Sequence, residues 1–106
     1  MENIKTLLNS ASLVYRAGDY TSATVLYFKA FFGILDLIIL RNRGIGPKSH
    51  TERFRILQKD FPHYYEILDK YFPIYQQTYV TKIEREICDE IKKQVTELAQ
   101  EQGIPE

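Results

Sequence analysis

The sequence LYFKAFFGILDLIIL, residues 26–40, decides the fold of this 106-residue chain. It is apolar around almost the whole circumference of a helix, and its only charged residues are Lys29 and Asp36. A charge near the middle of a membrane-spanning helix costs roughly 2.5 to 3.5 kcal/mol on insertion scales, so the sequence predicts a buried core helix rather than a membrane span. Asp19 is a plausible N-cap, and a glycine- and proline-rich segment follows Arg43. We therefore expect a central helix from Tyr20 to Arg43.

Patterning predicts three further helices. Apolar residues from Ile4 to Tyr15 recur at three- and four-residue spacing, and Gly18 can close that helix. Ser49-His50-Thr51-Glu52 fits a capping box, which begins a third helix. Thr81-Lys82-Ile83-Glu84 fits a second capping box, so we expect a last helix from there to Gly103.

Two prolines in the third helix, Pro62 and Pro73, are expected to divide or kink it. No segment of the sequence alternates in the manner of a strand. Long helices joined by short turns favour antiparallel neighbours. The sequence therefore predicts an all-α, up-and-down four-helix bundle that forms one domain over residues 1–106.

Composition argues against several classes of site. The only cysteine, Cys88, rules out an intramolecular disulfide and a cysteine-cluster metal site. His50 and His63 lack zinc-ligand spacing, and no glycine loop of the P-loop or Rossmann kind is present. The N-terminal residues do not have the pattern of a secretory signal. We expect a cytoplasmic protein that uses no metal or cofactor.

Positive charge is concentrated around the bend that follows the central helix. Residues 41–59 carry six basic residues and one acidic residue, whereas residues 60–106 carry five and ten, in a chain of net charge zero. This segment could bind phosphates, or it could pair with the acidic C-terminal half of the same chain or of a second copy. If it binds phosphates, the candidate residues besides Arg43 are Arg41, Lys48, Arg53 and Arg55.

Two polar patterns on the helices have alternative interpretations. Ser22, Lys29, Asp36 and Arg43 are spaced by seven, which indicates either a solvent-facing edge of the central helix or the lining of a groove or dimer seam. Tyrosines from Tyr71 to Tyr79 recur at helical spacing, which favours packing in the core or a dimer but also allows stacking on unpaired bases.

Arg43 and His50 flank the bend, so both side chains can face one point beside it. A histidine in the first turn of a helix feels the positive end of the helix dipole, which disfavours the imidazolium and leaves a neutral base. An arginine fork matches the oxygens of a phosphate. This pair would suffice for metal-independent attack of a ribose 2′-hydroxyl on its phosphate, although both residues are equally typical of ordinary helix ends.

The order of motifs along the chain resembles the HEPN family (higher eukaryotes and prokaryotes nucleotide-binding domains). The motifs are Gly18-Asp19-Tyr20 followed by Ala23, the aromatic-rich central helix, the glycine-rich turn, and Pro47-Lys48-Ser49-His50. The similarity spans roughly residues 3–100 and is greatest to the small stand-alone prokaryotic members.

The resemblance implies a helical bundle that forms a homodimer. In active members of the family it also implies an RNA-cleaving pair, an arginine and a histidine separated by four to six residues. Arg43 and His50 are separated by six, but Gly44 stands where active members usually carry a polar residue. Many small members resemble non-catalytic partners of minimal nucleotidyltransferases in toxin-antitoxin-like pairs, so both roles stay open, with Arg43 and His50 as the candidate catalytic residues.

A different class of function is also compatible with the sequence. Residues 18–23, Gly-Asp-Tyr-Thr-Ser-Ala, resemble the turn of a tetratricopeptide repeat, which would make the protein a scaffold that binds a protein partner. Only one such unit is present, and a solenoid needs about three repeats to bury a continuous core. The long central helix fits a bundle better.

Overall fold

The computed structural model describes residues 2–104 and shows a small all-α protein. These residues form five helices and no strand. The helices are α1 (Glu2–Arg16), α2 (Tyr20–Arg43), α3 (His50–Asp60), α4 (Pro62–Gln77) and α5 (Arg85–Glu101).

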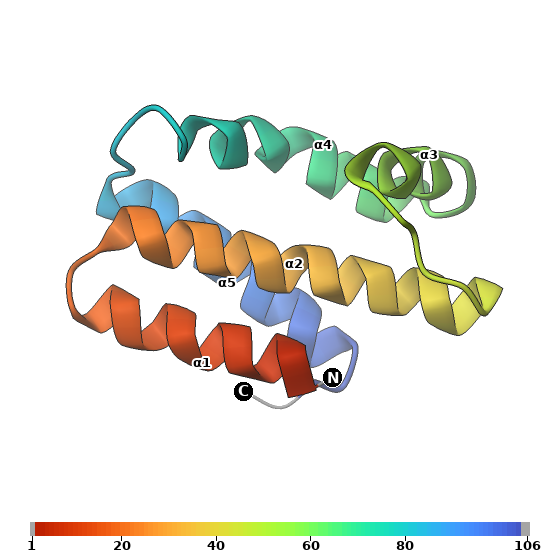
Figure 1. The fold of residues 1–106 in the computed structure, drawn as a ribbon, viewed down its shortest axis with the longest axis horizontal. Coiled ribbons are helices and arrows are strands. Elements are labelled where there is room, and N and C mark those ends of the chain that lie inside the picture. The colour runs from red at the N-terminus through yellow and green to blue at the C-terminus, as the bar shows by residue number, and fades with distance from the viewer. Residues whose placement is uncertain (1, 105–106) are drawn as a thin grey trace.

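The long helix α2 lies in the middle of the molecule (Figure 1). It contacts α1 and α5 on one side and the α3–α4 hairpin on the other. Its buried face is continuous along its length because apolar residues occupy most of its circumference. The buried residues of α2 are Ala23, Thr24, Tyr27, Phe28, Ala30, Phe31, Phe32, Ile34, Leu35, Ile38 and Ile39.

The predicted ends of the central helix are confirmed. The Asp19 carboxylate caps α2 by accepting a hydrogen bond of 3.0 Å from the amide of Ser22. Gly44 ends the helix in the left-handed region, with φ of 80°, and its amide donates to the carbonyl of Leu40. A residue with a Cβ is strained in that conformation, which explains why the helix stops at a glycine.

The predicted third helix is divided into two, so the chain has five helices rather than four. The break falls at Phe61, the residue before Pro62, because the proline ring disfavours the helical conformation of its predecessor. Pro62 then occupies the first turn of α4, where its missing amide leaves no hydrogen bond unmade. Pro73 lies inside α4 and does not end it.

The second predicted capping box is wrong, since α5 begins at Arg85 and its N-cap Glu84 makes no side-chain capping bond. The hydroxyl of Thr81 instead donates to the carbonyl of Gln77, at the end of α4. The amide of Ile83 donates to the hydroxyl of Thr21 at 2.8 Å, which ties this segment to the start of α2. Both polar groups are therefore engaged with other elements before α5 starts.

Within the described residues, α2 is the one helix long and apolar enough to cross a membrane by length and composition. About 61% of its most apolar stretch is buried inside the protein. Such burial is typical of a core helix.

Candidate functional site

Helix α3 separates two polar regions because its residues divide between two faces by helical period. His50, Arg53 and Leu57 lie on the face toward α2 and α4. Glu52, Arg55 and Lys59 lie on the opposite face. We refer to Asp36, Arg53 and His50 as the inner triad, and to the cavity lined by Arg43, Glu52, Arg55, Ile56 and Lys59 as the basic cleft.

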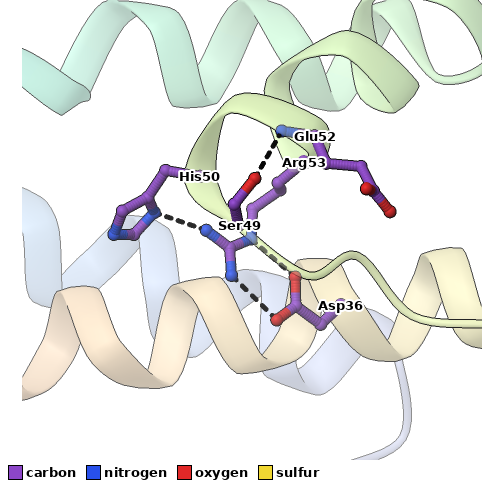
Figure 2. A network of polar contacts seen from close by, with 5 residues as sticks. All are labelled: Asp36, Ser49, His50, Glu52 and Arg53. Atoms are coloured by element: carbon purple, nitrogen blue, oxygen red, sulfur yellow. Dashed lines mark hydrogen bonds and ion pairs between the residues drawn. The ribbon is translucent and has the colours of Figure 1, made fainter.

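The inner triad is centred on the Arg53 guanidinium (Figure 2). Its Nε donates to Asp36 Oδ1 at 2.5 Å and its Nη2 donates to Asp36 Oδ2 at 2.9 Å. Its Nη1 lies 2.5 Å from Nδ1 of His50. Arg53 is only 8% exposed, so this cation is buried with a carboxylate on one side and an imidazole on the other.

His50 rests on aromatic rings while part of it stays exposed to solvent. Its ring centroid lies 4.9 Å from that of Phe32 and 5.8 Å from that of Phe72, both in edge-on arrangements. Partial burial and the neighbouring Arg53 cation lower the pKa of His50 below its ordinary value, while Asp36 opposes the change. His50 is therefore neutral near pH 7.

The contact with Arg53 also decides which nitrogen of His50 carries the proton. A guanidinium has only donors, so Nδ1 must accept from Arg53 Nη1. In a neutral imidazole the proton then resides on Nε2. As the triad stands, His50 offers solvent an N–H donor rather than a free basic nitrogen.

The basic cleft lies on the other face of α3 and has a volume of about 320 Å³. A neighbouring cavity of about 300 Å³ shares Arg43, Glu52 and Ile56 and adds Lys48 from the bend. Arg43 also pairs with Asp60 at 3.7 Å, but both side chains are largely exposed, which makes the pair weak. The two cavities form one surface in which basic side chains outnumber acidic ones.

The described contacts do not join Arg43 to His50. Figure 2 shows His50 and Glu52 on opposite sides of the first turn of α3, and Glu52 shares the basic cleft with Arg43. The arginine that contacts His50 is Arg53. The bend thus carries the two members of the predicted pair to different faces of α3.

The predicted phosphate-binding residues also divide between different surroundings. Lys48 and Arg55 line the basic surface, whereas Arg53 is buried in the inner triad. Arg41 is exposed and its Nη1 lies 3.4 Å from the carbonyl of Gln102.

Two residues of these regions, Lys59 and Asp36, were not singled out as site residues from the sequence. The four-residue spacing from Arg55 could have indicated Lys59. Asp36 lies 17 residues before Arg53, and no periodic pattern connects the two. The seven-residue polar stripe of α2 is not a solvent edge throughout, since at Asp36 it faces α3.

Among residues 2–104, no group of three or more histidine, cysteine, aspartate or glutamate side chains could hold a metal ion. Comparison with known proteins found no match to any family model, curated protein or solved structure. The argument for function therefore rests on the site and on the motifs of the sequence.

Proposed function

We propose that this chain is a HEPN-like helical protein that binds RNA phosphates through the basic cleft. It acts in the cytoplasm in RNA or nucleotide metabolism, as a homodimer that works with a nucleotidyltransferase-type partner in a toxin-antitoxin-like pair. The HEPN-like bundle corresponds to the four predicted helices, with the third divided at Pro62. The observation that carries the proposal is the convergence of Arg43, Lys48, Arg55 and Lys59 on one surface around a single acidic residue, Glu52.

Such a surface suits a phosphate backbone for electrostatic reasons. The four cations come from the end of α2, the bend and α3, so they are spread along a path rather than gathered at one point. A chain of phosphates can contact several of them in turn and release the counterions that each phosphate had condensed. Exposed lysine and arginine side chains give affinity in this way without reading sequence.

A salt titration with a fluorescent single-stranded RNA tests the proposal. For single strands, log affinity should fall against log salt with a slope near −0.7 for each phosphate contact. The double variant Arg55→Ala/Lys59→Ala should flatten the slope by about one unit and weaken binding. Lys82→Ala/Lys93→Ala removes the same charge outside the cleft and serves as the matched control. Equal binding by both double variants would contradict the proposal.

The nucleotidyltransferase-type partner is tested separately, by purifying the natively expressed protein and identifying what accompanies it. Recovery of a nucleotidyltransferase or RNA supports the proposal. Recovery of an unrelated protein bound through a peptide segment would favour the tetratricopeptide-like scaffold. The position of α2 between α1 and α5 on one side and α3–α4 on the other matches a bundle better than a stack of helix pairs.

Metal-independent cleavage of RNA is a second candidate, favoured by the neutral, partly exposed His50 beside a guanidinium. The arginine in place is Arg53, whose pairing with Asp36 would have to loosen before it could stabilise a pentacovalent phosphate. If the protein cleaves RNA, products should end in 2′,3′-cyclic phosphate, EDTA should not inhibit, and His50→Ala should abolish activity. Activity that survives His50→Ala would remove this candidate, as would inhibition by EDTA.

A further inference from the structure

The surface between α3 and the end of α4 carries a second set of groups suited to a nucleotide. His50 presents an Nε2–H donor because Arg53 occupies Nδ1 and is itself fixed by both oxygens of Asp36. An N–H donor of this kind can bond a phosphate oxygen. Protonation of Nδ1 is opposed by the adjacent guanidinium, so the arrangement persists at neutral pH.

Aromatic rings continue from His50 toward an exposed tyrosine. The centroid of Tyr75 lies 6.2 Å from that of His50, and the centroid of Tyr79 lies 5.5 Å from that of Tyr75. The hydroxyls of Tyr75 and Tyr79 are 2.8 Å apart, which fixes the Tyr79 ring relative to α4. Tyr75 is buried, but Tyr79 is 73% exposed, with Val80 beside it at 81%.

A large aromatic residue held in place and left mostly uncovered is a platform on which an unpaired base can stack. Stacking on such a ring tolerates any base, because every base has a flat π-face. The phosphate donor and the stacking ring thus lie at the two ends of one short aromatic series, His50, Tyr75 and Tyr79.

This surface adjoins the path of the RNA in the proposed function. Lys48 lines the basic surface and is two residues from His50, and α3 starts between the two faces. A strand that leaves the basic cleft across the start of α3 reaches His50 next.

We propose that His50 and Tyr79 form a subsite for one unpaired nucleotide of single-stranded RNA, in which His50 donates to a phosphate oxygen and Tyr79 stacks on the base. Arg53, held by Asp36, is the positioning residue that keeps the proton of His50 on Nε2. This subsite rests on the proposed function, since it receives a strand already bound at the basic cleft. His50 acts in it as a binding donor and not as a base.

Two pairs of variants test the subsite with a short fluorescent oligouridylate. His50→Ala and Tyr79→Ala should each weaken binding, by about tenfold for the lost stacking ring. His50→Gln retains a side-chain N–H donor and Tyr79→Phe retains the ring, so both should bind nearly as tightly as the wild type. Equal weakening by His50→Gln and His50→Ala would overturn the donor role of His50, and unchanged binding by both alanine variants would overturn the subsite.

Nitrogen chemical shifts of the His50 ring test the positioning role without RNA. We expect the proton on Nε2 at neutral pH in the wild type, and a raised pKa of His50 in Arg53→Gln because the opposing cation is gone. A wild-type ring protonated on Nδ1 would overturn the inference. Failure of the wild-type protein to bind the oligouridylate would overturn the proposed function and the subsite together, whereas binding that depends only on Arg55 and Lys59 would overturn the subsite alone.

Discussion

Arg53 holds a full positive charge in a place where only 8% of the residue reaches solvent. Burial of an ion is unfavourable unless a partner compensates, and here the Asp36 carboxylate does so with two hydrogen bonds. Asp36→Ala should therefore destabilise the protein by about 3 kcal/mol, near the lower limit for a broken buried pair because Asp36 itself is partly exposed. Urea unfolding monitored by circular dichroism measures the change.

A double variant separates the charge effect from packing. Asp36→Leu/Arg53→Met removes both charges and keeps the volume apolar, so it should be much closer to the wild type in stability than Asp36→Ala. If the double variant is as unstable as the single one, the loss comes from packing and the argument about an uncompensated cation fails.

Acid should destabilise the protein through His50. Partial burial and the Arg53 cation lower its pKa from the ordinary 6.5. Below about pH 6.5 the unfolded chain therefore takes up a proton that the folded protein resists, and stability falls until the pH passes the lower pKa of the folded state. We expect the unfolding free energy to decline across this window, and His50→Gln to remove this part of the decline.

The matched control for the acid effect is His63→Gln, which changes the other histidine, on α4. It should leave the decline with falling pH as it is in the wild type. The same pH dependence in both histidine variants would mean that other groups cause it.

At the scale of elements, one hydrogen bond attaches the α4–α5 connection to the start of α2, from the Ile83 amide to the Thr21 hydroxyl. Thr21→Val keeps the shape of the side chain but leaves the Ile83 amide without its acceptor, which should cost about 1 to 3 kcal/mol. Thr21→Ser keeps the hydroxyl and should lose less. Hydrogen exchange at the Ile83 amide should accelerate in the valine variant only, and equal exchange in both variants would contradict the role of this bond.

Element boundaries could be predicted from sequence where the signal was local. Asp19 and Gly44 act through bonds within one turn of α2, so both ends of that helix are visible in the sequence. The capping box at Thr81 was wrong because its competitors, Gln77 and Thr21, belong to other elements. A local motif cannot show that a distant hydroxyl offers a better partner.

The site was less predictable than the fold for a similar reason. The concentration of charge in residues 41–59 indicated a basic surface, and Lys48 and Arg55 do line one. The bend, however, turns Arg43 and His50 to opposite faces of α3, and the direction of a turn is not encoded in the spacing of its two ends. Asp36 was hidden because its partner Arg53 lies on another helix.

At the scale of the whole molecule, an apolar groove of about 350 Å³ runs beside α2 and includes Leu37 and Leu40. Leu40 is 46% exposed, and nearby in sequence Ile45 is 70% exposed. A two-fold partner would cover this patch with the same patch of its own. It could also set the basic segment 41–59 of each subunit against the acidic C-terminal half of the other.

We therefore expect light scattering at micromolar concentration to return twice the 12.5 kDa mass of one chain. Leu40→Asp places a charge in the groove and should produce monomers, because a carboxylate buried in an apolar contact must lose its water without gaining a partner. Leu13→Asp makes the same change on α1 outside the lining of the groove, where 62% exposure already leaves the side chain in water, so it should stay dimeric. A wild-type protein of monomer mass would remove the homodimer from the proposed function, and a dimeric Leu40→Asp would place the contact on another face.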